Sequence, residues 1–269
     1  MSDIPSSDIP VTPQLVRIDQ LLVEQGLASS RAQAQVAIKA GRVRVKKGDV
    51  WLPLTKSGVK LPAHTECNVT ADEVDRFVSR GALKLAGAIA ASGIDVSGMC
   101  CLDVGQSTGG FTDYLLQSGA ARVVGVDVGH DQLHPRLRAD ERVVCYEGIN
   151  ARELPSAELL QHTASHGFDL AVMDVSFISQ TKILPSLVPL IRPGGHLISL
   201  VKPQFEVGKA GISKGGIVRE PQLFIELKNT ITHTCKALGL SIIDYLESPI
   251  QGGDGNREFL LIAMVPAAI

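Results

Sequence analysis

The sequence predicts a mixed α/β fold: a mostly parallel sheet closed by an antiparallel hairpin and preceded by a small α+β domain. From about residue 81 onwards, short apolar runs typical of buried strands alternate with helical patterns, which implies right-handed crossovers and a parallel sheet. Two final apolar runs, 240–247 and 258–265, are joined by a glycine-rich loop and can pair as a hairpin. Residues 17–60 carry nine Lys or Arg and three Asp or Glu, a charge of +6, so the remainder must carry −8 to give the net −2.

Composition places the chain among soluble globular proteins. Its 269 residues can form one large or two modest domains, and 45% hydrophobic residues with a net charge of −2 exclude a disordered chain. Residues 1–14 have neither the basic start nor the apolar run of a secretion signal, so we expect a flexible tail there. The apolar run 259–265 is too short to cross a bilayer. These features predict a cytoplasmic protein with no membrane partner.

The five cysteines are predicted to be reduced thiols, mostly in the core. They are odd in number and show neither a C-x-x-C pair nor nearby histidines at metal-ligand spacing. Most fall in apolar runs, where cysteine acts as a small hydrophobic residue; they are Cys67, Cys100, Cys101, Cys145 and Cys235. We therefore expect no disulfides and no metal site.

The first domain, over residues 15–71, is predicted to bind RNA through a basic surface. Its expected elements are a helix over 17–26, a second helix capped by Ser29 or Ser30 and ended by Gly41, a strand over 43–46 and a turn over 47–49. Basic side chains on such a small module suit a phosphate-rich partner, with a solvated charged face as the alternative. The candidate RNA contacts are Arg17, Arg31, Arg42, Arg44 and Lys46, with Arg80 in the charged linker over 72–80.

Residues 100–113 (Cys-Cys-Leu-Asp-Val-Gly-Gln-Ser-Thr-Gly-Gly-Phe-Thr-Asp) predict a buried strand, a loop of small residues and a helix that begins near Gly110. A turn of this kind presents backbone N–H groups to an anionic or nucleoside ligand, although an ordinary α/β turn is the alternative. Its spacing differs from the G-x-G-x-x-G of dinucleotide sites, which favours S-adenosylmethionine (SAM) over a nicotinamide cofactor.

Two later residues extend this predicted cofactor site. Asp127 ends the next strand about 20 residues on, where a carboxylate can bind ribose hydroxyls. Asn150 follows the third strand, where it could contact an adenine. The full set of expected cofactor-binding residues is Asp103, Gly105, Ser107, Gly109, Gly110, Phe111, Asp127, Asn150 and Asp174.

The second domain, over residues 81–269, has a predictable order of elements. We expect helices over 81–92, 111–118 and 221–238, and strands that begin at 100, 123, 143, 168 and 195, before the terminal hairpin. Residues 192–195 are expected to form a turn before the fifth strand. The glycine-rich segment 206–219, with Lys209, Lys214 and Arg219, is either a mobile flap over an anionic substrate or a plain surface loop.

Four charged residues are predicted to meet at the carboxyl edge of the sheet, where ligands of open α/β sheets bind. They are Lys84, Asp174, Lys202 and Glu258. Asp174 and Lys202 each close an apolar strand, where an unpaired charge would be costly, so pairing between acids and lysines is expected. A structural salt bridge explains one such pair but explains less well why two lysines and two acids converge there.

The chain resembles the TlyA family, often labelled hemolysin A, from about residue 15 onwards. The matching motifs are Val78-Ser79-Arg80-Gly81, Asp103-Val104-Gly105, Ser107-Thr108-Gly109-Gly110-Phe111-Thr112-Asp113, Asp127-Val128-Gly129, Asp174-Val175-Ser176-Phe177, Lys202-Pro203-Gln204-Phe205-Glu206 and Glu258-Phe259. The resemblance implies an S4 RNA-binding domain joined to an FtsJ-like methyltransferase domain. It also implies 2'-O-methylation of cytidine in 16S or 23S rRNA, or in both, with ribosomal subunits as partners.

The resemblance further implies that Lys84, Asp174, Lys202 and Glu258 form a catalytic tetrad. Lys202 is the expected base, its pKa lowered by burial and by the Lys84 charge; Asp174 would align the lysines and Glu258 would fix the hydroxyl or the base. The sequence departs from the family at Gln106, which is expected to crowd the methionine end of SAM, and at Ala82. The alternatives are an RNA-binding protein with an inactive SAM fold, a membrane-active hemolysin, and a nicotinamide dehydrogenase. The oligomeric state is left open.

Overall fold

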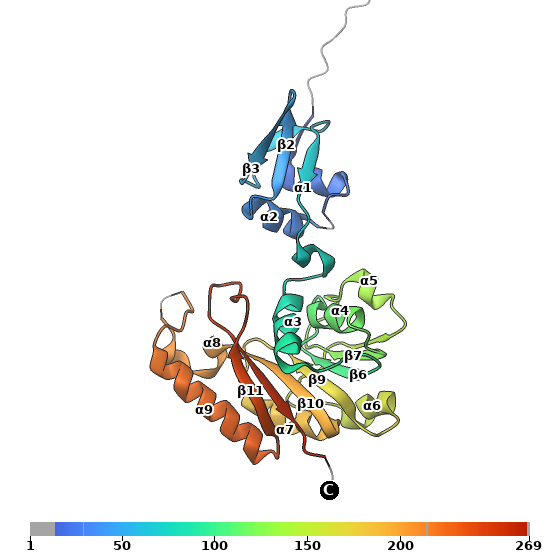
Figure 1. The fold of residues 1–269 in the computed structure, drawn as a ribbon, viewed down its shortest axis with the longest axis vertical. Coiled ribbons are helices and arrows are strands. Elements are labelled where there is room, and N and C mark those ends of the chain that lie inside the picture. The colour runs from blue at the N-terminus through green and yellow to red at the C-terminus, as the bar shows by residue number, and fades with distance from the viewer. Residues whose placement is uncertain (1–13, 29, 214, 268–269) are drawn as a thin grey trace, which may run out of the picture. The chain divides into compact units, whose positions relative to one another are not determined.

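The computed structural model describes residues 14–28, 30–213 and 215–267, and the chain divides between Asp75 and Arg76 into two compact units (Figure 1). The predicted tail therefore lies outside the described residues except for Gln14, whose carbonyl accepts a hydrogen bond from the amide of Ala63. Within the predicted linker, Phe77 is buried, and residues from Arg76 onwards belong to the second unit.

The first unit contains the two predicted helices and more strands than the sequence pattern indicated. Its elements are β1 (Leu15–Arg17), α1 (Ile18–Glu24), α2 (Arg31–Lys39), β2 (Val43–Lys47), β3 (Val50–Leu54), β4 (Lys60–Pro62) and β5 (Cys67–Val69), followed by the 3-10 turn Glu73–Arg76. The Ser30 hydroxyl accepts from the amide of Gln33 and caps α2, as predicted; Ser29 lies outside the described residues. β1 pairs with β4, and the other three strands form a sheet in the order β3-β2-β5. The apolar faces of α1, α2 and β2 form its core.

The second unit is built on one seven-stranded sheet in the order β11-β12-β10-β9-β6-β7-β8. The strands are β6 (Cys100–Val104), β7 (Arg122–Val126), β8 (Val143–Tyr146), β9 (Phe168–Met173), β10 (Ile191–Val201), β11 (Ser241–Glu247) and β12 (Phe259–Met264). The first five are parallel, and β12 is antiparallel to both of its neighbours. The predicted parallel sheet and terminal hairpin are thus confirmed.

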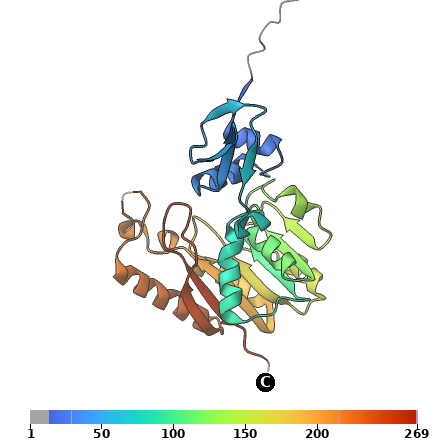
Figure 2. The same ribbon diagram turned by 45° about the horizontal axis from the view of Figure 1, so that its top comes forward.

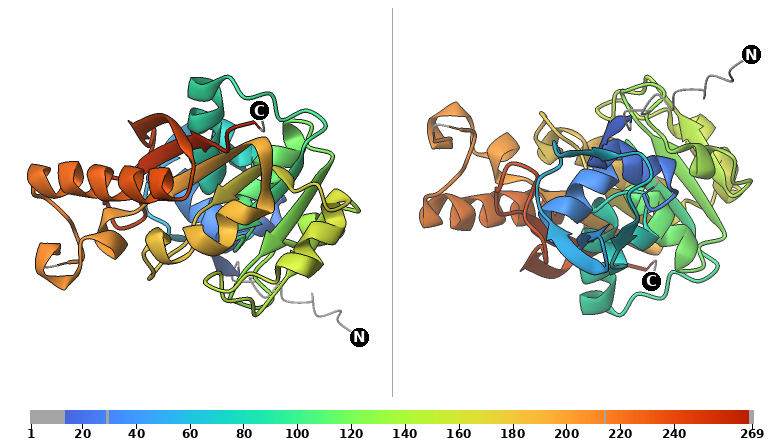
Figure 3. Two further views of the ribbon diagram at one scale, coloured as in Figure 1. Left: turned by 90° about the horizontal axis from the view of Figure 1, so that it is seen from below. Right: turned by 90° about the horizontal axis from the view of Figure 1, so that it is seen from above.

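Helices cover both faces of this sheet (Figures 2 and 3). On one face pack α3 (Gly81–Ser92), α4 (Gly110–Gln117) and α5 (Pro135–Arg138), and on the other α6 (Ser156–Leu160), α7 (Leu184–Leu187) and α9 (Pro221–Ala237). Successive strand residues alternate between the two cores, since side chains of a strand point alternately to opposite faces. Both faces are therefore apolar, and the polar residues collect at the strand ends.

Two expected loops differ from the prediction. The turn over 192–195 is part of β10, which shifts register between Ile191 and His196 and pairs with β9 on both sides of the irregularity. The segment 206–219 is less free than a flap: Pro203–Glu206 forms the short helix α8, and the Asn256 side chain bonds the amide of Val218 and the carbonyl of Gly216. Lys214 lies outside the described residues.

All five cysteines are free, as predicted, and burial raises the pKa of the Cys235 thiol to about 12. Nowhere in the part of the chain that the structure describes is there a helix both long and apolar enough for a bilayer crossing.

Candidate active site

The loop after β6 lies against the end of β9. Gly105 has φ +85°, and a Cβ at this position would overlap the carbonyl oxygen of Asp174. At the start of α4, a Cβ on Gly110 would overlap the hydroxyl of Ser79. Glycine is therefore required at position 105, because the backbone of Asp174 approaches too closely for any side chain, whereas at position 110 the Ser79 hydroxyl would have to move. This packing brings the ends of β6 and β9 and the start of α3 to one point.

A cavity of about 240 Å³, here called the lysine cavity, opens at this point. Its lining combines the loop after β6 with both candidate lysines: Ser79, Gly81, Lys84, Gly105, Gln106, Ser107, Thr108, Gly110, Phe111, Asp174, Ser176 and Lys202. Three of the four predicted catalytic residues thus face one space, although they come from α3, the end of β9 and the end of β10.

Each lysine is held by a carboxylate. Lys84 Nζ lies 2.5 Å from Glu258 Oε2, and Lys202 Nζ lies 2.6 Å from Asp174 Oδ1. Lys202 also donates to the Ser176 hydroxyl over 2.9 Å. The side chain of Glu258 is only 3% exposed and does not line the cavity, so it acts on Lys84 and not on a ligand. The four residues therefore form two lysine–carboxylate pairs, and among the described residues Asp174 makes an ion pair only with Lys202.

A second, larger cavity of about 560 Å³, here called the apolar cavity, adjoins the first and shares Gly105, Ser107, Asp174 and Ser176 with it. Asp127 lies in its wall and accepts hydrogen bonds from the amides of Ser107 and Gly129, each at 2.7 Å. The rest of the lining is mainly Val126, Val128, Gln132, Ile149, Asn150, Ala151, Arg152, Val175, Phe177, Ile178 and Ile183. A largely apolar slot with carboxylates and side-chain amides in its wall suits a nucleoside.

Two predicted cofactor residues, Asp103 and Gly109, line neither cavity. Gly109, with φ +92°, lies beneath Leu133 and Leu137 and allows them to cover the loop. Gln106 lines the lysine cavity, but its side chain is largely turned away from it, and its effect on SAM stays a prediction. Its buried side chain fills the space above Gly125, where any Cβ would overlap it.

Gln106, Thr112 and Asp103 form a buried polar chain beneath the loop. The Gln106 amide donates to the Thr112 hydroxyl over 2.9 Å, and this hydroxyl donates to Asp103 Oδ2 over 2.6 Å. Asp103 Oδ1 and Gln106 Oε1 are buried and have no hydrogen-bond partner among the described residues. Burial raises the pKa of Asp103 to about 7, and the Asp174 charge adds to this effect.

This pKa predicts a specific pH dependence of stability. A carboxyl with an ordinary value near 3.8 and a folded value of about 7 binds more protons when folded, so its contribution falls as pH rises from about 4 to about 7. Asp103→Asn keeps an acceptor for Thr112 without the charge. We expect its free energy of unfolding in urea to fall less between pH 5 and pH 8 than that of the wild type. Equal pH slopes for the two proteins would contradict the prediction.

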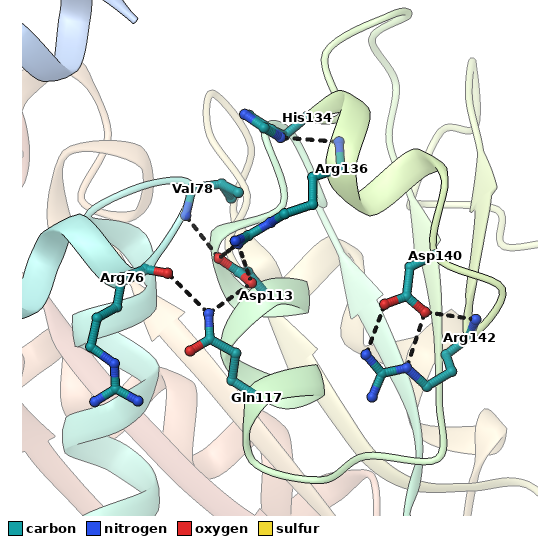
Figure 4. Close-up of polar contacts among 8 residues, drawn as sticks. All are labelled: Arg76, Val78, Asp113, Gln117, His134, Arg136, Asp140 and Arg142. Carbon is teal, nitrogen blue, oxygen red and sulfur yellow. Dashed lines mark hydrogen bonds and ion pairs between the residues drawn. The ribbon is translucent and has the colours of Figure 1, made fainter. Parts of the chain in front are cut away.

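Asp113, which the sequence motif contains but to which no role was assigned, braces the cavity wall. Figure 4 shows the amide of Val78 and the side chains of Gln117 and Arg136 directed at its buried carboxylate, at 2.7 to 3.0 Å. The same Gln117 amide also donates to the carbonyl of Arg76. One side chain thus fastens the segment before α3 and the start of α5 to α4.

A second brace was also missed. The buried carboxylate of Glu206 on α8 accepts from the Ser179 hydroxyl and the Gln180 amide, at 2.6 and 2.9 Å, and burial raises its pKa. It fixes the segment that follows Asp174 against the segment that follows Lys202. The family motif contains Glu206, but only the fold reveals its partners, which lie 26 and 27 residues away.

The candidate RNA contacts of the first unit differ in how free their charges are. Arg17 and Arg31 both pair with Asp19, whose pKa is held well below its usual range, chiefly by the hydrogen bond from Arg17. Arg42 is largely buried and pairs with Asp72 and Asp75. Lys46 pairs with the exposed Glu66, whereas Arg44, and Arg80 of the second unit, are exposed and form no ion pair with any described residue. Arg42 thus also ties β2 to the segment after β5, and its contact with RNA stays a prediction.

The strand order, the glycine loop at the end of the central β6 and the adjoining nucleoside-sized cavity define the class: a Rossmann-like methyltransferase. The FtsJ-like methyltransferase family model matches residues 77–264, and the S4 domain model matches residues 16–45. A likeness to a SAM-dependent methyltransferase from Mesorhizobium loti, at 16% identity and a TM-score of 0.50 over 67% of this chain and 97% of that one, supports the fold alone.

The chain belongs to the TlyA family of FtsJ-like methyltransferases, and it is an enzyme. It is 43% identical, over 91% of its length and 88% of the relative's, to the 16S/23S rRNA (cytidine-2'-O)-methyltransferase TlyA of Mycobacterium tuberculosis. It is 36% identical to Hemolysin A of Brachyspira hyodysenteriae, over 91% of this chain and 98% of that protein. A solved structure from Streptococcus thermophilus, provisionally labelled a hemolysin, matches with a TM-score of 0.72 and 39% identity over 95% of this chain and 90% of that one.

Proposed function

We propose that the protein transfers a methyl group from SAM to the ribose 2'-hydroxyl of a cytidine in 16S or 23S rRNA, or in both, in the cytoplasm. Residues 15–71 would bind RNA, 72–80 would link the domains and 81–269 would carry the reaction. The observation that carries the proposal is the lysine cavity, with two lysine–carboxylate pairs beside a nucleoside-sized slot. The relatives named as rRNA cytidine-2'-O-methyltransferases support the choice of substrate.

The residues present fit SAM. The apolar cavity has room for an adenosine, with Asp127 at hand for the ribose hydroxyls and Asn150 for the base. Because Gly105 has no side chain, the loop presents its backbone to the bound SAM. Beneath the loop, Asp103 Oδ1 has no hydrogen-bond partner among the described residues, and the negative potential of this oxygen favours the positively charged SAM. The shared wall of the two cavities would then place the methyl donor beside Lys202.

Lys202 is proposed as the general base. When bound, SAM supplies a methyl group on a positively charged sulfur. To act as the base, Lys202 must first release a proton to solvent; its neutral amine would then accept the proton of the 2'-hydroxyl while the hydroxyl oxygen takes the methyl group and the sulfur leaves as a neutral thioether. Asp174 and Ser176 aim this amine, while Glu258 holds Lys84 in the same cavity, where its charge can bind the nucleotide's phosphate or oxygen. Alignment of the three reacting atoms supplies much of the acceleration.

Phe177 is proposed to hold the target base. It is 90% exposed at the rim of the apolar cavity, has φ +65°, and directly follows the Ser176 that bonds Lys202. A nucleotide turned out of its helix needs such an aromatic surface. We expect Phe177→Ala to raise the KM for rRNA about 5- to 100-fold, as loss of one base–aromatic stack does, and to leave the Kd for SAM unchanged.

The control is Val128→Ala, an exposed residue in the wall of the same cavity. It should raise the KM for rRNA by no more than about twofold, since it has no π-face for a base. An equal loss of SAM and RNA affinity in Phe177→Ala would show that Phe177 covers the cofactor instead.

Methyl transfer to purified undermethylated small and large ribosomal subunits tests the proposed function. Labelled methyl on a cytidine 2'-oxygen would establish the reaction and name the subunit. No label on either subunit, with SAM binding demonstrated by calorimetry, would leave the inactive RNA-binding protein as the better description.

A further inference from the structure

The three-stranded sheet of the first unit has one covered and one open face. In β2, Val43 and Val45 are buried in the core, so Arg44 and Lys46 between them face outwards. Because residues paired across an antiparallel ladder lie on the same side, their partners share this open face. The open face therefore consists of Arg44 and Lys46 on β2, Trp51 and Pro53 on β3, and Asn68 on β5.

Trp51 on this face is the only tryptophan in the chain. It is 38% exposed on β3, which forms one edge of the sheet (Figure 1). Its indole makes no hydrogen bond, ring contact or cation–π contact with any residue in the part of the chain that the structure describes. A large aromatic residue that neither fills a core nor bonds its polar N–H is available to a ligand.

The charges around Trp51 suit an anionic partner. Lys46 lies directly across from Trp51, and Arg44 is its diagonal neighbour. Glu66 pairs with Lys46, but both are at the surface, where such pairs are weak and exchange with water. Arg44 has no such partner among the described residues. An aromatic face flanked by cations is the arrangement that stacks on bases and binds the adjoining phosphates.

We propose that Trp51 stacks on an unpaired base of the RNA while Arg44 and Lys46 bind neighbouring phosphates. The inference rests on the proposed function, since it takes RNA as the partner, and it adds a base contact on the sheet to the charged contacts predicted for this unit. A base stack reads single-stranded RNA, whereas cations alone also bind duplex. The first unit thereby selects unpaired segments and not only negative charge.

Self-association through the β3 edge is the competing use of this surface. Edge strands can pair with a second copy, and Val50 and Leu52 are also exposed. However, Pro53 has no amide to donate to a new ladder, and Arg44 and Lys46 would repel the same residues of a second copy. The observations therefore favour RNA.

Because Trp51 is unique, its fluorescence reports the contact in the full-length protein. The probes are protein-free, unmodified transcripts of 16S and 23S rRNA, with a perfect RNA duplex for comparison. We expect saturable quenching by a transcript and little by the duplex. In filter binding, Trp51→Ala should weaken the affinity for that transcript about 5- to 100-fold, and Trp51→Phe by less than about threefold. Val50→Ala, an exposed neighbour on the opposite side of β3, is the matched control and should bind as the wild type does.

Three results would overturn the inference: RNA binding with unchanged Trp51 emission, equal RNA affinity of Trp51→Ala and wild type, or loss of a dimer in Trp51→Ala by sedimentation with RNA affinity retained. Should Trp51→Ala lower the melting temperature, Trp51→Thr replaces it, since threonine suits an exposed strand. Failure of the proposed function is distinguishable. If RNA quenches Trp51 in the wild type and Trp51→Ala loses RNA affinity, but no methyl group is transferred, the Trp51 contact is supported and the proposed reaction is not.

Discussion

Lys202→Ala is expected to lower kcat for methyl transfer about 100- to 10,000-fold and to change the Kd for SAM by less than about threefold. Asp174 and Ser176 hold the amine of Lys202 towards the lysine cavity, at 2.6 and 2.9 Å. Among the described residues, the other titratable side chains that line this cavity are Lys84 and Asp174, and both are themselves in ion pairs. The measurement is single-turnover transfer of labelled methyl to undermethylated subunits, with SAM affinity determined by calorimetry on the same preparations.

Lys202→Arg separates the base from the salt bridge. Arginine can preserve the ion pair with Asp174 but stays protonated and so cannot accept the hydroxyl proton. We expect it to be nearly as inactive as Lys202→Ala. Lys236→Ala, an exposed lysine near the end of α9, controls for loss of a positive charge and should be fully active. Substantial activity in Lys202→Arg would remove the base role and leave an electrostatic one.

Gly105→Ala is expected to weaken SAM binding more than about 100-fold and to abolish transfer. The new Cβ would overlap the carbonyl oxygen of Asp174 and lie 3.1 Å from Val175, so either the loop or the end of β9 must move. Both cavities share this wall, so the same movement would distort the cofactor cavity and displace Asp174, the ion-pair partner of Lys202. Calorimetry with SAM and a thermal melt check this expectation.

Gly98→Ala is the matched control for backbone strain. Gly98 has φ +73°, close to the +85° of Gly105, but its Cβ would meet nothing within 4 Å. It should cost about 1–2 kcal/mol of stability and leave the Kd for SAM unchanged. A Gly105→Ala protein that binds SAM as Gly98→Ala does would show that the loop does not need the close approach.

The alternation of apolar runs predicted the sheet well because each strand is defined by its own residues. The hairpin, the glycine loop and the four charged residues were likewise visible as local patterns at strand ends. What local pattern could not reveal was which partner each polar group finds. Nothing local to Gln106, for example, indicated that its side chain fills the space above Gly125, 19 residues later on a neighbouring strand.

The same limit explains the other differences. Arg42 was predicted to contact RNA from its place beside basic neighbours, but its ion-pair partner Asp75 lies 33 residues away in sequence. Pairing between the lysines and the acids was expected, but the sequence did not indicate which acid each lysine would find; Lys84 pairs with Glu258 across 174 residues. Residues 192–195 have turn composition, and their inclusion in β10 depends on the pairing of this segment with β9. These ion pairs and strand pairings depend on the tertiary fold, and residue types alone do not determine them.

The Asp113 brace has a consequence for how related sequences can diverge. A buried carboxylate that loses one of its donors keeps a charge without compensation, which is more costly than losing the whole arrangement. The donor from Val78 is a backbone amide and survives every substitution except proline, but those from Gln117 and Arg136 do not. Positions 113, 117 and 136 should therefore change as a set during evolution, even though they lie on two different helices.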